Sequence, residues 1–227
     1  RHGATSVTAY RDMGYFAEAV VNYLVRLAWS HGDQEIFTRQ ELLDLFSLEH
    51  VGKAAGVFNP EKFLWVNFHY LKTKPLSQLA EEVVPYIQAK GYPVPQDRQW
   101  LEKMIATLRE RARTLVELVA MARYYLDDQI VYDEKAAAKF LTASAADSMS
   151  FLAGKLAALS EFTEANVEQA FTSTLEEHNL KMGELAQPVR VALTGSTVSP
   201  GIHAVIAVLG KERSVARLKH AVERAKA

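Results

Sequence analysis

Cysteine is absent from this sequence of 227 residues, which also contains only 11 glycines and seven prolines. Without a thiol, the chain has no disulfide and no thiolate metal site. No stretch approaches 18 consecutive apolar residues and no basic-then-apolar leader is present, so we expect neither a membrane span nor a signal peptide. Together these absences favour a cytoplasmic protein that makes no contact with a membrane.

The composition is that of an ordinary globular protein, with 49% apolar and 23% charged residues. A net charge of −1 conceals an uneven distribution. Residues 124–184 contain 11 acidic and four basic residues, whereas residues 185–227 contain seven basic and two acidic residues. The basic end suits a polyanionic partner, and the alternative is a set of charged helix faces in water.

Apolar residues recur at helical spacing along the chain, as in the stripe Phe16, Val20, Leu24 and Leu27. Helices are expected over residues 16–29, 38–46, 59–71, 75–91, 96–126 with a break near 109–114, 133–141, 146–160, 163–179, 183–195, 199–210 and 211–226. No run alternates apolar and polar residues long enough to predict a strand, and no hairpin turn is evident. The pattern predicts an all-α fold, an irregular array of many short helices without a regular repeat.

Residues typical of catalysis are scarce. The seven histidines are scattered and form no pair on one helix face, so no metal site is expected. The segment "ALTGSTVSPG" is rich in small residues, but no strand precedes it, and it is interpreted as a loop rather than a phosphate cradle. The pairs Asp127-Asp128 and Glu176-Glu177 are interpreted as surface charge. The chain therefore lacks the groups of a self-sufficient enzyme.

The segment "LRERART" is a candidate recognition surface. On a continuous helix, Arg109 and Arg113 share a face while Arg111 points away from them. At a helix break, Arg111 would project a planar donor fork toward a base edge or a phosphate. The alternative is that these arginines pair in water with Glu110 and Glu117.

A second basic group lies near the C-terminus and consists of Arg190, Lys211, Arg213, Arg217 and Lys219. Such cations suit contacts with phosphates. The three tryptophans, Trp29, Trp65 and Trp100, lie within apolar stripes and are interpreted as core residues rather than as platforms for base stacking.

Four blocks of sequence resemble one family. "RHGATSV" is similar to the segment that follows the Lys-Leu-Ser-Lys signature of bacterial-type glutamyl-tRNA synthetases. "GYFAEAVVNYLVRLAWSHGDQEIFT", "FNPEKFLWVNFHYL" and "LAQPVRVALTGSTVSPGIHAVIAVLGKER" resemble later blocks of the same family, in the same order. The resemblance implies that the chain begins just downstream of a catalytic nucleotide-binding domain.

The resemblance implies a parent enzyme that is a class I aminoacyl-tRNA synthetase. The parent would activate glutamate with ATP and magnesium and transfer it to glutamate tRNA. Glutamate and ATP would bind the missing domain, so this fragment would hold no catalytic residue, no cofactor and no metal. Arg1 and His2 would remain from the signature loop, and a monomer is expected.

The resemblance also implies a domain order. Residues 1–74 would form a helical stem-contact region. Residues 75–123 and 124–227 would form a two-part helical anticodon-binding cage. This implied fold agrees with the all-α prediction made from periodicity.

By motif position, Arg111 matches the family residue that reads the third anticodon base, and Arg190 matches one that contacts the first two. The loop residues matching base-contacting positions are Ser199, Pro200 and Ile202. The residues expected at the tRNA backbone are Arg109, Lys211, Arg213 and Arg217. An arginine at position 111 favours an enzyme specific for glutamate tRNA. Ala17 departs from the family, which often has proline there, and this affects only a local helix start.

Two other functions remain open. One is a helical protein-interaction or scaffold module derived from a synthetase. The other is a synthetase-like paralogue that modifies tRNA, although a complete anticodon cage counts against it. Binding to glutamate tRNA would separate the first of these from a tRNA-binding region.

Overall fold

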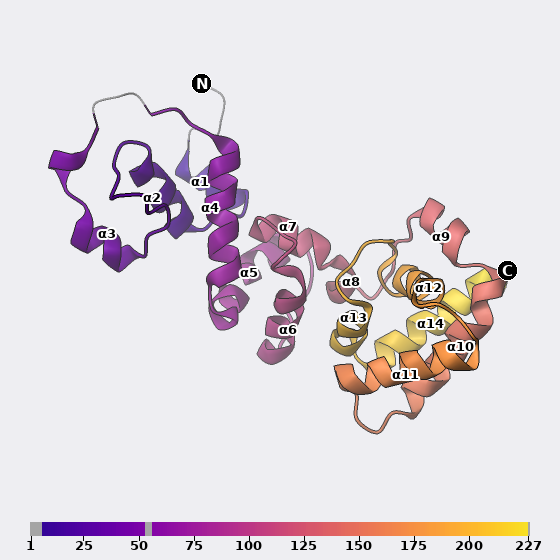
Figure 1. Cartoon of the computed structure of the whole chain (residues 1–227). Coiled ribbons are helices and arrows are strands. Elements are labelled where there is room, and N and C mark those ends of the chain that lie inside the picture. The colour runs from indigo at the N-terminus through magenta and orange to yellow at the C-terminus, as the bar shows by residue number, and fades with distance from the viewer. Residues whose placement is uncertain (1–5, 53–55, 227) are drawn as a thin grey trace. The chain divides into compact units, whose positions relative to one another are not determined.

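The computed structural model describes residues 6–52 and 56–226, in which helices and connecting segments account for the whole architecture and no strand is found (Figure 1). One isolated antiparallel bridge joins Trp29 and Val51. No helix in the described ranges is both long and apolar enough to cross a bilayer. The all-α prediction is confirmed, and the chain forms two compact units, Arg1–Met121 and Ala122–Ala227, described here one at a time.

The helices of the first unit are α1 (Val7–Asp12), α2 (Ala17–Arg26), α3 (Arg39–Leu45), the 3₁₀ helix η1 (Leu48–His50), α4 (Pro60–Thr73), α5 (Leu76–Ala89), α6 (Arg98–Leu108) and α7 (Leu115–Met121). Those of the second unit are α8 (Arg123–Leu126), α9 (Glu134–Phe140), α10 (Ala143–Ala158), α11 (Glu164–Glu177), α12 (Met182–Thr194), α13 (Ile202–Leu209) and α14 (Lys211–Lys226). The predicted break between α6 and α7 is confirmed. The short helices α1, η1 and α8 were not expected as separate elements, because fewer than two turns carry little periodic signal.

Helix starts follow the local sequence. Thr38 accepts a hydrogen bond from the backbone of Glu41 at 3.1 Å, and the Glu41 carboxylate accepts one from the Thr38 backbone at 2.6 Å. This reciprocal pair is a capping box, which satisfies two amides that have no partner inside the helix. Asn59 caps α4 by accepting from the Lys62 backbone at 3.0 Å, with Pro60 at the first helical position. Local side chains thus determine where α3 and α4 begin.

In the first unit, α4 is the element that holds its neighbours together. Asn67, fully buried in α4, accepts a hydrogen bond from the Phe16 backbone at 2.8 Å and donates one to the Arg113 carbonyl at 2.7 Å. The rings of Tyr23 and Phe63 stack with their centroids 4.5 Å apart. Because one amide side chain joins the start of α2 to the α6–α7 turn, the position of that turn depends on the core of the first unit.

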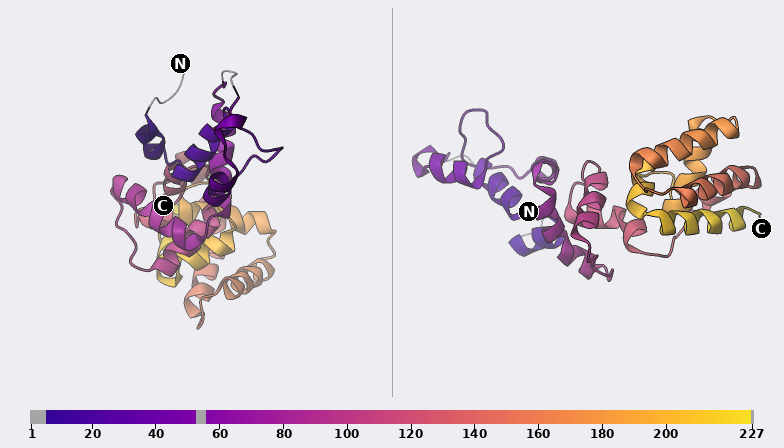
Figure 2. Two further views of the ribbon diagram at one scale, coloured as in Figure 1. Left: turned by 90° about the vertical axis from the view of Figure 1, so that its left-hand side faces the viewer. Right: turned by 90° about the horizontal axis from the view of Figure 1, so that it is seen from below.

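In the second unit, α10 and α14 make the most extensive helix–helix contact, and α11, α12 and α13 complete the core (Figures 1 and 2). Met149 and Leu152 of α10, Phe171 of α11, Val189 of α12 and Leu218 of α14 are completely buried. Burial of five such side chains at one centre gives this unit an apolar core of its own.

The division into units bears on the expected domain limits without testing their roles. The expected limit between residues 123 and 124 lies close to the division after Met121, and the expected limit between residues 74 and 75 lies inside the first unit. At that inner limit Lys74 is buried. The stem-contact and anticodon-binding roles of these regions stay predictions.

Candidate nucleic-acid interface

The turn between α6 and α7 carries Arg111 on a firmly held backbone. The amides of Arg111 and Ala112 donate to the Leu108 carbonyl at 2.8 and 3.1 Å. The Ala112 side chain is completely buried, and the Arg113 carbonyl accepts from Asn67 at 2.7 Å. The backbone is therefore fixed on both sides of Arg111, while the Arg111 side chain is exposed.

The acidic neighbours of Arg111 have other partners. Glu110 pairs with Lys72 of α4 at 3.0 Å, and the Glu117 carboxylate accepts from the backbone amide of Arg113 at 2.8 Å. Within residues 6–52 and 56–226, the Arg111 guanidinium forms no hydrogen bond or ion pair. The alternative in which Glu110 neutralises Arg111 is therefore not seen in the structure, because Glu110 pairs with Lys72. Base reading by Arg111 stays a prediction.

Other predicted residues around this region are less informative. Arg109 is half-buried and its backbone amide closes α6 by donating to the Ile105 carbonyl at 2.9 Å. The predicted signature-loop remnants Arg1 and His2 lie outside the described residues.

The second candidate site is the loop between α12 and α13, residues 195–201. Gly195 ends α12 in the left-handed region, with φ of 76°. A Cβ at this position would lie 2.2 Å from the Val131 carbonyl oxygen, so only glycine fits. The Gly195 carbonyl in turn accepts from the Asp133 amide at 2.8 Å. The start of the loop is thus packed against residues 131–133.

Arg190 of α12 holds the far end of the same loop. Its Nη1 donates to the Pro200 carbonyl at 2.9 Å, to the Ser199 carbonyl at 3.3 Å and to the Ser199 hydroxyl. The Ser199 hydroxyl donates to the Pro200 carbonyl at 2.9 Å. Arg190, Ser199 and Pro200, which the sequence picked out separately, therefore form one hydrogen-bonded group.

The predicted base-contacting side chains of this loop are buried in the structure. Ser199 is 8% exposed, Ile202 is 6% exposed and begins α13, and Pro200 is also buried. Val198, by contrast, is 71% exposed. Ser199, Pro200 and Ile202 thus pack on the inner side of the loop, and base contact by their side chains stays a prediction.

Two basic residues of α14 that were expected at the tRNA backbone, Lys211 and Arg213, are bound to other parts of the protein. The Lys211 ammonium donates to the Leu159 carbonyl at the end of α10. Arg213 pairs with Asp128 and donates to the Tyr125 carbonyl at 2.7 Å. Lys211 thus caps the end of α10, and Arg213 forms an ion pair and a hydrogen bond to a carbonyl. The sequence pattern did not reveal these contacts.

Arg217 differs most from its expected role at the tRNA backbone. It is 7% exposed, and its guanidinium donates to the carbonyls of Tyr124, Leu193 and Asp127. A buried guanidinium with three carbonyl partners has little to offer a phosphate in solvent. The structure therefore gives Arg217 a structural role in place of the expected phosphate contact, because its guanidinium is buried and already binds backbone carbonyls.

One face of α4 combines basic and aromatic side chains and was missed by sequence reasoning. Trp65 is 46% exposed, which contradicts its interpretation as a core residue, whereas Trp29 is 2% exposed as expected. The Lys62 ammonium lies 4.2 Å from the centre of the Trp65 ring, and His69 and Lys72 follow one and two turns later. The spacing of three and four residues between these side chains was the available signal.

The first unit also contains an acidic cluster around a buried lysine. Lys74 is 8% exposed and pairs with Glu18 at 2.9 Å and with Glu82 at 2.5 Å. Burial opposes ionisation of Glu18, but the hydrogen bond and charge of Lys74 outweigh it and hold the pKa of Glu18 below its ordinary value. The cluster joins α2 to α5.

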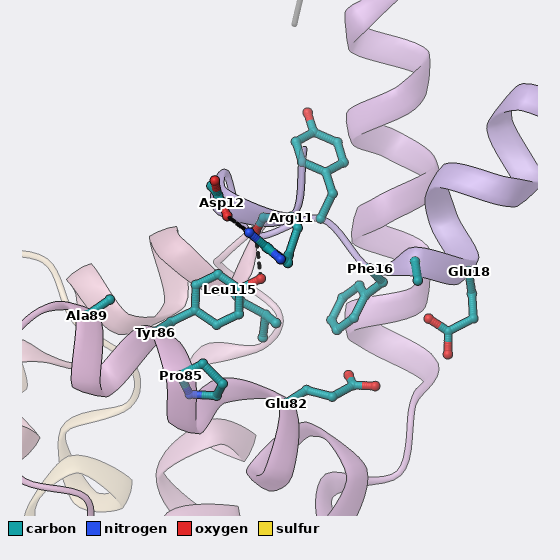
Figure 3. Close-up of a pocket in the computed structure, with 11 residues that line it drawn as sticks. Arg11, Asp12, Phe16, Glu18, Glu82, Pro85, Tyr86, Ala89 and Leu115 are labelled. Atoms are coloured by element: carbon teal, nitrogen blue, oxygen red, sulfur yellow. Dashed lines mark hydrogen bonds and ion pairs between the residues drawn. The ribbon is translucent and has the colours of Figure 1, made fainter. Parts of the chain in front are cut away.

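Glu18 and Glu82 also line a pocket of about 510 Å³, where their carboxyl groups point toward one another beside the ring of Phe16 (Figure 3). Pro85, Ala89 and Leu115 give the pocket an apolar wall. No group of side chains suited to a metal ion occurs in the described part of the chain.

Two family models match separate stretches of the chain. Residues 78–222 match the family model described as "Anticodon binding domain". Residues 1–65 match the model described as "tRNA synthetases class I (E and Q), catalytic domain".

Curated relatives are similar over nearly the whole chain. A glutamate–tRNA ligase of Syntrophobacter fumaroxidans is 53% identical over 222 residues, which are 98% of this chain and 47% of the relative. The corresponding ligase of Geobacter sulfurreducens is 50% identical with the same coverage. The chain thus spans about half the length of the curated relatives it matches.

Solved structures of glutamate–tRNA ligases are also similar to this chain. A glutamate tRNA ligase from Elizabethkingia meningosepticum, crystallised with its amino acid, matches 94% of this chain and 42% of its own length with a TM-score of 0.84 and 27% identity. One from Elizabethkingia anophelis matches with a TM-score of 0.79. Because the family model covers more than half of the sequence and the relatives agree with it, the chain belongs to the anticodon binding domain family in the form found in glutamate–tRNA ligases.

Proposed function

We propose that this chain is the tRNA-binding region of a glutamate–tRNA ligase, and that its partner is glutamate tRNA. In this proposal residues 75–227 bind the anticodon and residues 1–74 bind the stem. The enzyme to which it belongs joins glutamate to tRNA in the cytoplasm at the expense of ATP, with magnesium. In this proposal ATP and glutamate bind the part of the catalytic domain that is not included in residues 1–65, and the described residues carry tRNA recognition.

The exposed guanidinium of Arg111 is the observation that supports this proposal most directly. It sits on a backbone held by Leu108, Ala112 and Asn67, and no described residue occupies its donors. A base is read by a donor fork that is placed in advance and not already paired. On α4, the exposed ring of Trp65 would add a stacking surface for the stem. Lys62 and Lys72 beside it would add cations on release from their ion pairs with Glu35 and Glu110.

One observation favours the scaffold alternative. Several large apolar side chains of the first unit are exposed, including Leu43 at 69%, Leu48 at 77% and Val57 at 84%. Exposed apolar groups are typical of protein interfaces. A scaffold module would use this surface and would not bind tRNA.

Binding of the chain to glutamate tRNA, measured against an unrelated tRNA over a range of salt, tests the proposal. With a handful of phosphate contacts, affinity should fall roughly 10³-fold between 50 and 200 mM salt. Replacing Arg111→Gln should cost about 1–3 kcal/mol of the preference for C over G at the third anticodon position. Arg98→Gln is the control, because Arg98 is an exposed arginine of α6 that is bound by Glu81, Glu102 and the Ser77 carbonyl within the protein.

The outcomes are distinct. Absence of tRNA binding would reject the proposal in favour of the scaffold. Binding with an unchanged preference in Arg111→Gln would remove Arg111 from base reading while leaving tRNA recognition in place.

A further inference from the structure

Arg217 is a buried cation placed where two helices end. Its Nη1 lies 2.7 Å from the Tyr124 carbonyl oxygen and 3.0 Å from that of Leu193, and its Nη2 lies 2.7 Å from that of Asp127. Tyr124 lies within the one-turn helix α8, Asp127 directly follows it, and Leu193 lies in the last turn of α12. One side chain therefore joins two segments of the second unit that are far apart in sequence.

The physical basis for this arrangement is the chemistry of helix C-termini. The last four carbonyls of a helix lack intrahelical partners and carry partial negative charge, which a cation stabilises. The guanidinium presents several donors in a rigid plane, so it can serve carbonyls from two helices together. Burial, aided by the nearby charge of Arg213, lowers the pKa of Arg217 to about 10, and the group remains protonated at neutral pH.

The carbonyl of Leu193 lies at the entrance to the loop 195–201. Two residues later, Gly195 turns the chain, and its carbonyl accepts from the amide of Asp133, in the segment that follows Asp127. The exit of the loop is held by Arg190 through Ser199 and Pro200. The loop is therefore fixed at its exit by Arg190 and at its entrance by the contacts that Arg217 organises.

We propose that Arg217 is a positioning residue for anticodon recognition: by fixing the end of α12 against residues 124–127, it sets the orientation of Arg190 and of the loop 195–201. This inference rests on the proposed function and on the expectation from the sequence that Arg190 and this loop contact the first anticodon bases. Arg217 itself touches no nucleotide. Its effect on recognition passes through the backbone at Leu193.

Arg213 provides a matched control. It lies one turn before Arg217 in α14 and holds the same segment, through the Tyr125 carbonyl and Asp128. Its hydrogen bonds to described residues do not include a carbonyl of α12. Loss of Arg213 therefore loosens residues 124–128 without releasing Leu193.

The test compares Arg217→Lys, Arg217→Met and Arg213→Met in the whole chain. Dissociation constants are measured for a glutamate tRNA transcript and for the same transcript with its first anticodon base changed. The ratio of the two constants should fall about five- to tenfold in both Arg217 variants, because lysine keeps the charge but lacks the planar fork. Arg213→Met should lower the melting temperature and leave the ratio unchanged.

A second readout keeps the inference separate from the proposed function. Amide hydrogen exchange should accelerate across residues 194–201 in Arg217→Lys and not in Arg213→Met. If the unaltered chain binds no tRNA, the proposed function fails; if it binds both transcripts equally, this loop does not read the first anticodon base. In either case exchange alone decides the positioning role. Equal exchange and an equal ratio in the Arg217→Lys and Arg213→Met variants would overturn the inference, leaving Arg217 a general stabiliser.

Discussion

Arg111 in the first unit and Arg190 in the second are both expected at the anticodon, yet the fold treats them in opposite ways. Arg111 is exposed, and no described residue binds its guanidinium. Arg190 is half-buried, and its guanidinium is bound to the loop residues Ser199 and Pro200. The guanidinium of Arg111 is available to a ligand, whereas Nη1 of Arg190 already donates hydrogen bonds within the protein.

This difference separates two ways of building a recognition site. A free side chain must lose rotamer entropy when it binds, so its contribution to affinity is reduced but its removal leaves the fold intact. A side chain that organises a loop is ordered beforehand, and its removal alters the loop itself. Recognition by Arg111 should therefore be separable from stability, and recognition by Arg190 should not.

The largest expected effect comes from the glycine that starts the Arg190 loop. Gly195→Ala should destabilise the second unit by about 3 kcal/mol, because the new Cβ meets the Val131 carbonyl and the backbone is left-handed. Gly91→Ala is the control in the first unit: its φ is 78°, but nothing lies within 4 Å of the new Cβ. It should cost only about 1 kcal/mol. Urea unfolding followed by amide exchange would measure both.

An equal loss of unfolding free energy in the two glycine variants would show that the backbone at residues 131–133 moves aside at little cost. The Arg190 loop would then be no more constrained than the surface turn at Gly91, and the contrast between the two arginine sites would weaken.

The arginines themselves give a smaller effect. Arg190→Met should lower the free energy of unfolding by about 2 kcal/mol, since it removes the donor to the Ser199 carbonyl and one of the two donors to the Pro200 carbonyl. Arg111→Met should change it by less than about 0.5 kcal/mol, because an exposed side chain without partners is removed. Denaturant midpoints of the two variants provide the measurement, and a similar loss in both would contradict the distinction.

The smallest effect concerns acid. Burial works against ionisation of Glu18, but Lys74 holds the pKa of Glu18 below its ordinary value; the hydrogen bond and charge of Arg213 do the same for the pKa of Asp128. A lowered carboxyl pKa adds stability that is complete above the unfolded pKa and is lost as pH falls through the folded one. Unfolding free energy should therefore decline as pH falls below about 5.

Glu18→Gln should flatten this decline in the first unit, and Asp128→Asn should flatten it in the second at somewhat lower pH. Denaturant midpoints between pH 3 and 6 test both. The Asp128 effect should be the weaker, because that ion pair is mostly in solvent. A steeper slope in either variant would contradict the assigned direction.

Prediction from sequence succeeded where the cause is local and failed where it is not. The capping box at Thr38, the start of α4 at Asn59 and the break around Arg111 depend on residues within a few positions, and the structure contains them all. Trp65 was misread because a lone aromatic in an apolar stretch gives no sign of which face is covered. Arg217 was misread because a basic residue in a basic helix looks solvent-exposed until its carbonyl partners are known.

The amino-acid sequence by itself determined that the chain is helical, where most helices begin and end, and which family it resembles, because periodicity, caps and motifs act over short distances along the chain. Only the tertiary structure decided which basic side chains face solvent and which are bound by backbone carbonyls in the interior. The carbonyls that hold Arg217 lie 24 to 93 positions away along the chain. Only the packing of α8, α12 and α14 brings those unsatisfied helix ends within reach of one guanidinium.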